Sequence, residues 1–229
     1  MEAIHEMHAK SNFLSDFILG SQDGLVNVLG IILGVTAASV SIQIVFIASL
    51  AALVAESISM GAVAYTSTSA RRKQYLKEVE REKFEMRTMP QMERAEVKEI
   101  FREWGYKGSK LEKVTDDITS NPKAWLEFMM AHELKLAPVA KGQPLRSGVL
   151  VGLASVVGSA IPLVPFIFTS NIPTGVMWSI AVSGVALFLI GVYEAKTTVG
   201  SLWASGIRMA IIGLVAGIGG YLVGRLLGA

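Results

Sequence analysis

Long stretches almost without charge constrain this chain more than any other feature. Between residues 24 and 66 the only ionised side chain is Glu56. After residue 146 the charged side chains are Glu194, Lys196, Arg208 and Arg225. A helix needs about 20 predominantly apolar residues to cross a bilayer, and segments of this kind lie at about residues 21–39, 43–68, 147–168, 174–194 and 201–226. The sequence therefore predicts an all-α membrane protein with five transmembrane helices.

Basic residues flank some of these segments and not others, and this asymmetry predicts their orientation. They follow the second segment, precede the third and follow the fourth: Arg71, Arg72, Lys73, Lys141, Arg146 and Lys196. Loops rich in Lys and Arg remain in the cytosol. We therefore expect residues 71–146 and the 195–200 loop to be cytosolic, and the C-terminus to lie on the opposite side.

A charged segment, residues 71–141, interrupts the membrane-like sequence, and its apolar residues recur at helical spacing. We expect three helices in this insert, the first a continuation of the second span. Gly105 and Gly108 end one helix, and Asn121-Pro122 begins another. The predicted organisation is an interfacial helix with transmembrane helices 1 and 2 (1–70), a helical metal-binding domain (71–141), and transmembrane helices 3 to 5 (142–229).

Two acidic pairs in the insert have the spacing of one helical turn. Glu82 and Glu85 form the first pair, and Glu93 and Glu96 form the second, so each pair shares one helix face. Pro90 lies between the pairs, and proline is favoured at the first position of a helix. We therefore expect the chain to fold back there and the two pairs to face each other.

Met129 and Glu133 add a thioether and a further carboxylate, four residues apart on one helical face. Carboxylates alone suit Mg²⁺ or Ca²⁺, whereas a sulfur ligand shifts the preference toward transition metals. The chain has no cysteine, so thiolate sites and disulfides are excluded. The six residues thus indicate a divalent transition-metal site. The alternative is a solvated acidic face with Met129 packed in the core, and spacing alone leaves both open.

Polar side chains inside the predicted spans form a second candidate site. Glu56 lies well inside the second span with Met60 one turn further on, while Asp23 and Asn27 share a face of the first. Ionisable residues within membrane helices are costly, and they usually face a bundle interior or an ion path. We therefore predict that these four residues line a cation path. The alternative for Asp23 is a helix cap at the headgroup level.

Small residues and one basic residue give further expectations for packing. Gly30 and Gly34 form a G-x-x-x-G face, which suits a close helix contact either within the chain or across a dimer axis. Arg208 in the fifth span is expected to pair with Glu194 or to extend toward the interface.

Three motifs resemble those of the vacuolar iron transporter family, and the match covers nearly the whole chain. They are D23-G-L, S57-I-S-M60-G, and the long run N121-P-K-A-W-L-E-F-M-M130 with E133-L. The resemblance implies five transmembrane helices, a three-helix cytosolic insert between helices 2 and 3, and a homodimer. By this resemblance, the metal ligands of the family's insert correspond to Glu82, Glu85, Glu93, Glu96, Met129 and Glu133 in this chain. The family's membrane ligands correspond to Asp23 and Met60.

The chain departs from the plant members of that family near the second motif. Plant members carry a glutamate eight residues before the signature methionine, where this chain has Ala52. Here the carboxylate is Glu56, which lies one turn, about 6 Å, further along the same helix face. The resemblance therefore implies that the path is kept with its carboxylate displaced.

The functional hypothesis is a proton-coupled transporter that removes Fe²⁺, or Mn²⁺, from the cytosol, and not an enzyme. The metal is its substrate, and no organic cofactor or nucleic-acid partner is expected. The membrane would be the plasma membrane in a prokaryote and the vacuolar membrane in a eukaryote. The alternative is a membrane-anchored metal-binding protein acting as a ferroxidase or a metal sensor. Carboxylate-bridged di-iron bundles use Glu-x-x-His pairs, and the insert contains none.

Overall fold

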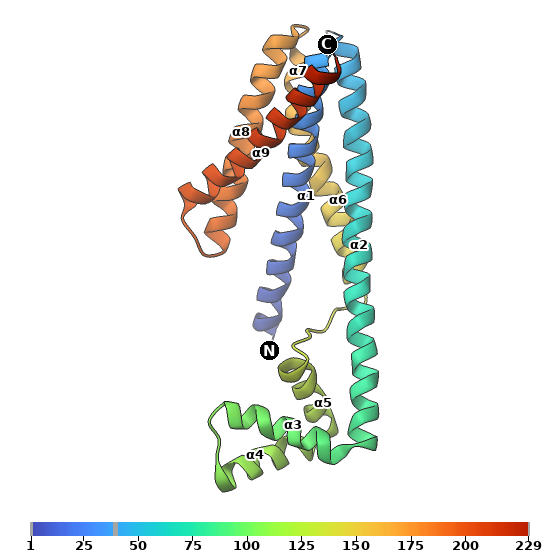
Figure 1. Ribbon diagram of the computed structural model, residues 1–229, viewed down its shortest axis with the longest axis vertical. Helices are drawn as coiled ribbons and strands as arrows, with labels where there is room; N and C mark the ends of the chain where they lie inside the picture. Colours follow the sequence, from blue (N-terminus) through green and yellow to red (C-terminus); the bar gives the residue numbers. More distant parts are fainter. Residues whose placement is uncertain (1, 39–40, 229) are drawn as a thin grey trace. The chain divides into compact units, whose positions relative to one another are not determined.

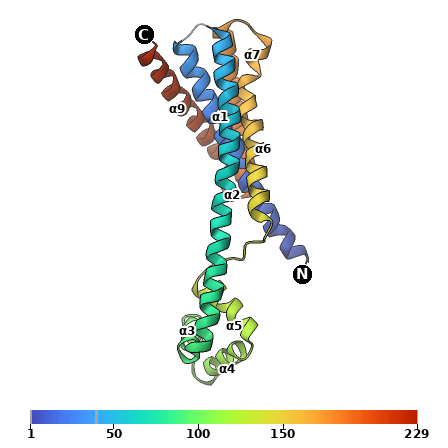
Figure 2. The same cartoon turned by 90° about the vertical axis from the view of Figure 1, so that its right-hand side faces the viewer.

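The computed structural model describes residues 2–38 and 41–228, with side chains from residue 13 onward (Figures 1 and 2). Every regular element in this part of the chain is helical. The chain forms two compact units, one of Met1–Thr66 with Pro144–Ala229 and the other of Ser67–Gln143. We call the first the membrane unit and the second the insert.

The helices that lie wholly or partly in the membrane unit are α1 (Glu2–Ala38), α2 (Ile42–Thr88), α6 (Gln143–Leu163), α7 (Pro165–Phe168), α8 (Ile172–Thr197) and α9 (Leu202–Leu227). The part of α2 after Thr66 belongs to the insert. Five of them, all except α7, contain windows long and apolar enough to span a membrane. This confirms the predicted all-helical class and the five spans. At about 1.5 Å per residue, the 47 residues of α2 are more than twice what a span requires, so only its apolar first part is needed to cross a bilayer.

Two boundaries in the membrane unit differ from the prediction. An interfacial helix was expected to lead into a span beginning near residue 21, and the structure has no helix boundary at that point, because α1 runs from Glu2 to Ala38. The third span was expected to reach residue 168, but α6 ends at Leu163 and Pro165 begins the short α7. Pro165 has no N–H to continue the α6 hydrogen-bond ladder. Near this break, the Ser179 hydroxyl on α8 donates a hydrogen bond of 2.8 Å to the Pro162 carbonyl.

Close backbone approaches hold α1 against its neighbours, and they decide the role of the G-x-x-x-G face. A Cβ atom at Gly34 would lie 3.0 Å from the carbonyl oxygen of Gly220 on α9. A Cβ atom at Gly24 would lie 2.8 Å from the Ser155 hydroxyl on α6. The Gly30/Gly34 face therefore packs against α9 within the chain.

The last two helices form an antiparallel hairpin that also contacts α1, as Figure 1 shows for α8 and α9. Asn171 and Ser201 cap their N-termini by accepting hydrogen bonds from backbone N–H groups. The Arg208 guanidinium on α9 donates to both carboxylate oxygens of Glu194 on α8, at 3.2 and 3.0 Å. The expected Arg208–Glu194 pair is thus confirmed.

The insert contains the end of α2, then α3 (Pro90–Glu103), α4 (Gly108–Thr119), α5 (Pro122–Phe128) and a π-helical turn, η1 (Met129–Glu133). Pro90 occupies the first turn of α3, as predicted, and Asn121 caps α5. The α2 extension was counted among three insert helices, but three helices follow it, because breaks at residues 104–107 and 120–121 separate α3, α4 and α5. Their shared core contains Val97, Phe101, Leu111, Trp125, Phe128 and Met129.

Candidate metal-binding sites

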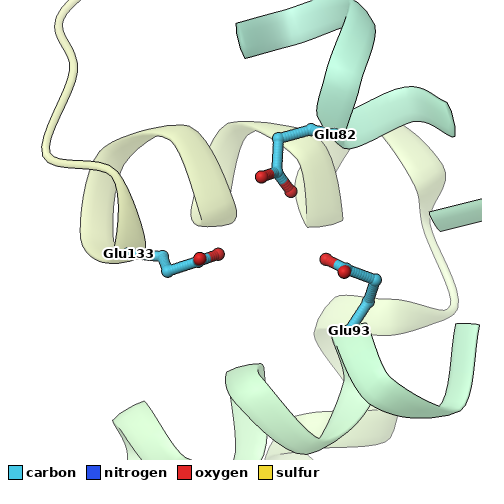
Figure 3. A group of neighbouring side chains, drawn as sticks. All are labelled: Glu82, Glu93 and Glu133. Carbon is cyan, nitrogen blue, oxygen red and sulfur yellow. The ribbon is translucent and has the colours of Figure 1, made fainter. Parts of the chain in front are cut away.

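Three carboxylates from three different elements meet in the insert. Glu82 comes from α2, Glu93 from α3 and Glu133 from η1, and one oxygen of each lies within 4.8 Å of the other two. Figure 3 shows the three side chains directed toward a common point. The chain reversal at Pro90 brings Glu93 back against Glu82, as the sequence analysis expected. These distances are short enough for one divalent cation to bind all three groups.

Burial leaves two of these carboxylates with unsatisfied oxygens. Glu82 and Glu93 are only 1% and 4% exposed, whereas Glu133 is exposed. The Oε2 atoms of Glu82 and Glu93 are buried and have no hydrogen-bond partner within the described part of the chain. Burying a carboxylate without a partner is unfavourable, and buried charges are normally paired or bound to metal. The pocket of Glu82, Glu93 and Glu133 therefore suits a cation.

Crowding also changes the acidity of the three groups. Burial, followed by the charges of Glu96 and Glu82, raises the pKa of Glu93 to about 7. Partial burial is the largest cause that raises the pKa of Glu133 to about 7, and the negative charges of Glu96 and Glu82 are the next largest. Burial and the charge of Glu85 raise the pKa of Glu82, which lies in the charged part of α2 beyond its apolar segment. A divalent cation would remove the repulsion that causes these shifts.

The other predicted ligands have different positions. Glu85 and Glu96 lie close enough to act on the pKa of Glu93 but are not among the three converging carboxylates. Met129 is fully buried and packs in the insert core, which is what the core-packing alternative expected. Met129 and Glu133 bound a π-turn in which the Leu134 N–H donates to the Met129 carbonyl. Such turns occur frequently at functional sites.

Sequence reasoning did not single out Arg81. Its guanidinium lies 3.5 Å from a Glu85 oxygen and 3.9 Å from a Glu82 oxygen. It also lowers the pKa of Glu133, against the larger raising effects. The Arg81–Glu85 spacing of four residues is a known helix pairing and was the available signal. Arg81 thus offsets part of the negative charge without filling the space between the carboxylates.

The predicted polar residues of the membrane unit also come together. The Asn27 amide donates to the Asp23 carboxylate at 3.3 Å, and the carboxyl groups of Asp23 on α1 and Glu56 on α2 lie close enough to interact electrostatically. Glu56 also lines an open cleft of about 700 Å³, together with Asn27, Gly30 and residues of α9. Met60 is half-buried, one turn beyond Glu56 on α2. A carboxyl pair from α1 and α2 is therefore present among the spanning helices.

Comparison with known proteins places the chain in a family. Its fold is that of a helical integral membrane protein, and residues 14–225 match the VIT family. The chain belongs to the VIT family. It is 32% identical to vacuolar iron transporter 1 of Oryza sativa subsp. japonica, over 95% of this chain and 88% of the relative. It is 29% identical to vacuolar iron transporter 1 of Arabidopsis thaliana (98% and 92%). It is 27% identical to the vacuolar iron transporter of Plasmodium falciparum (93% and 82%).

Proposed function

We propose that this protein transports Fe²⁺, and also Mn²⁺, out of the cytosol in exchange for protons. The observation that carries the proposal is the Asp23–Glu56 carboxyl pair between two candidate spanning helices of a VIT family member. Relatives over nearly the full length of the chain are named vacuolar iron transporters. An ion that crosses a bilayer must exchange its water shell for protein ligands, and an acidic pair supplies them.

The membrane pair accounts for proton exchange in this proposal. In this proposal the empty pair carries a proton, which relieves the repulsion between two neighbouring carboxylates. An entering divalent cation takes the place of that proton. Release of the cation on the far side allows Asp23 and Glu56 to be protonated again, and Asn27 holds the Asp23 carboxylate in position through its amide. Met60 offers a thioether that favours Fe²⁺ over Mg²⁺.

The insert acts as a collector in this proposal. Glu82, Glu93 and Glu133 bind the ion first, supported by Glu85, Glu96 and Met129. Basic residues at positions 71–73 and 141–146 favour a cytosolic insert. The membrane would be the vacuolar membrane in a eukaryote and the plasma membrane in a prokaryote.

We propose further that the functional unit is a homodimer. The cleft that contains Glu56 is open along the side of the membrane unit, and an ionisable group facing lipid is unfavourable. A second copy covering this cleft would enclose the path. Gly30 and Gly34 of α1 line this cleft beside α9, so the second copy would contact α1 and α9 along it.

Transport into proteoliposomes is the direct test. Purified protein is reconstituted and the uptake of Fe²⁺ and Mn²⁺ is followed with and without a pH gradient, under reducing conditions. We expect uptake driven by the gradient, together with metal-dependent proton movement. Equal uptake without a gradient would contradict proton exchange, and binding without any uptake would favour the sensor alternative.

A further inference from the structure

A second cleft in the membrane unit belongs to neither acidic site. It lies among α1, α8 and α9, has a volume of about 420 Å³, and is less open than the Glu56 cleft. Its walls include Leu29 and Leu33 of α1, Ile180 and Leu187 of α8, and Leu214 and Ile218 of α9. Tyr221 is the only residue among those lining it whose side chain carries a polar atom. A cleft with such walls does not bind water or ions.

Gly184 keeps this cleft open. It lies on α8 at the wall of the cleft, and a Cβ atom built on it would meet nothing within 4 Å. Gly217, on the opposite wall, is different, because a Cβ atom there would lie 2.8 Å from Leu33. The space in front of Gly184 is therefore not needed for contact between helices, and a side chain there would occupy the cleft.

The position of the cleft limits what can fill it. All the residues that line it belong to helices that meet the length and hydropathy of membrane spans. In the hydrocarbon region the available molecules are lipid chains, and a single fatty acyl chain has a comparable volume. A hydrocarbon chain gains packing contacts there that the cleft would lack if empty.

One end of the cleft carries the groups that bind a lipid headgroup. Ile218 and Tyr221 line the cleft, and Arg225 lies one turn beyond Tyr221 on the same face of α9. Arg225 is exposed and makes no ion pair with any side chain that the structure describes. This end of α9 lies near the end of α1, since Gly228 is adjacent to Ala38. Tyr and Arg at the end of a span are typical of the headgroup level.

We propose that the cleft among α1, α8 and α9 is a binding site for one membrane glycerophospholipid. One acyl chain lies in the cleft beside Gly184, and the headgroup phosphate accepts hydrogen bonds from Arg225 and Tyr221. The lipid fills the junction of the α8–α9 hairpin with α1 and stabilises it. This site is independent of both acidic sites and of transport.

The test compares two phenylalanine substitutions at neighbouring positions of α8. Gly184→Phe places a ring in the cleft, whereas Val185→Phe places it on the 61% exposed neighbour that does not line the cleft. Delipidated full-length protein in detergent is titrated with palmitoyl-oleoyl phosphatidylglycerol while its unfolding temperature is followed. We expect a saturable rise for the wild type and Val185→Phe, and no rise for Gly184→Phe. Equal responses of the two variants would overturn the site.

A second variant tests the headgroup contact without changing the cleft. Because a hydrogen bond to a charged group is worth about 1.5–3 kcal/mol, Arg225→Gln should weaken phosphatidylglycerol binding roughly tenfold or more. Palmitate, which lacks a phosphate, should stabilise wild type and Arg225→Gln alike and only weakly. Unchanged phosphatidylglycerol binding by Arg225→Gln, or palmitate as effective as the phospholipid, would overturn the assignment of a phospholipid.

Discussion

The two candidate acidic sites of this protein are built differently. In the insert, five carboxylates act on one another, and the pKa of Glu93 rises to about 7 as a result. In the membrane unit, the candidate site is smaller and contains the carboxyl groups of Asp23 and Glu56 and the amide of Asn27. Near water, additional acidic groups are tolerated. Within a membrane each ionisable group is expensive, so few are present.

The largest effect should follow from neutralising the membrane pair. Asp23→Asn and Glu56→Gln each preserve shape but remove charge and proton exchange. Without the carboxylate, the charge of the ion in the path is no longer offset, and an unpaired charge in the bilayer centre costs at least ~2.5–3.5 kcal/mol. Either change should therefore lower gradient-driven Fe²⁺ transport by roughly 100-fold or more. Proteoliposome uptake measures this, and calorimetry should show that the insert still binds metal.

Glu194→Gln is the matched control, because it removes a spanning-helix carboxylate that pairs with Arg208 instead of lining the path. Transport should be close to that of the wild type. A Glu56→Gln protein with normal rate and normal pH dependence would assign the proton role to Asp23 alone.

Neutralising the insert cluster should have a large effect on binding and a smaller one on transport. The triple change of Glu82, Glu93 and Glu133 to Gln should weaken Fe²⁺ or Mn²⁺ binding by roughly 100-fold or more, because three charged ligands are lost. Transport should slow but persist, since the cluster lies outside the path. Isothermal titration calorimetry and uptake, on the full chain, separate the two effects.

The control triple replaces Glu99, Glu103 and Glu127, which are exposed or half-exposed acidic residues of the same unit outside the cluster. It removes the same number of carboxyl groups, so equal loss of binding in both triples would indicate a diffuse charge effect and contradict a defined site.

Two methionine substitutions should have smaller and distinct effects. Met60→Leu removes the sulfur beside the membrane pair and should lower selectivity for Fe²⁺ over Mg²⁺ by about a few-fold, with little change in rate. Met129→Leu keeps the volume of a fully buried core side chain, so the insert should remain folded. Competition of Mg²⁺ with Fe²⁺, in uptake and in binding, measures both. If Met129→Leu leaves binding selectivity unchanged, Met129 is a core residue only.

The smallest expected effect is on the stability of the metal-free insert. The pKa values of Glu93 and Glu133 are about 7 in the folded state, compared with 4.5 for an unperturbed glutamate as in the unfolded chain. The folded state therefore binds more protons between these values, so stability is fully present below about pH 4.5 and is lost as the pH rises through about 7. The unfolding temperature should fall by about a few degrees over this range.

Fluorescence of Trp104 and Trp125 reports this unfolding once Trp178 and Trp203 of the membrane unit are replaced by Phe. Saturating Mn²⁺ should reverse the trend, because binding to deprotonated carboxylates strengthens with pH. The cluster triple is the control, and a pH trend that survives in it would contradict the assignment to these groups.

Sequence periodicity and charge predicted most of the fold, because spans and breakers are local properties. The five spans, the continuation of α2 and the turn at Pro90 all follow from local sequence. The division of α6 from α7 was missed, although Pro162 and Pro165 mark it. The choice between dimer contact and internal packing for Gly30 and Gly34 depends on the position of α9, which no local pattern contains.

The candidate sites were predictable as residue types but not as geometry. Spacing identified Glu82, Glu93 and Glu133 but could not separate them from Glu85 and Glu96, which remain outside the converging group. Asp23 and Glu56 were visible as charges in or beside apolar segments, with Asn27 and Met60 one turn away, and the resemblance separately pointed to Asp23 and Met60. Arg81 was missed because it looked like one more charge on a solvated helix.

The π-turn at Met129–Glu133 sets the direction in which Glu133 points within the candidate metal site. A π-turn holds one residue more than the α-turn it replaces, and each residue of an α-helix advances the direction of the side chains by about 100°. If this segment relaxed to a regular α-helix with all its residues kept, Glu133 would turn away from Glu82 and Glu93 by roughly the rotation of one residue, although every ligand would still be present. The direction of Glu133 therefore depends on the backbone form of this segment as well as on the identity of its side chains, and a substitution that favours a regular α-helix here should separate Glu133 from the other two carboxylates.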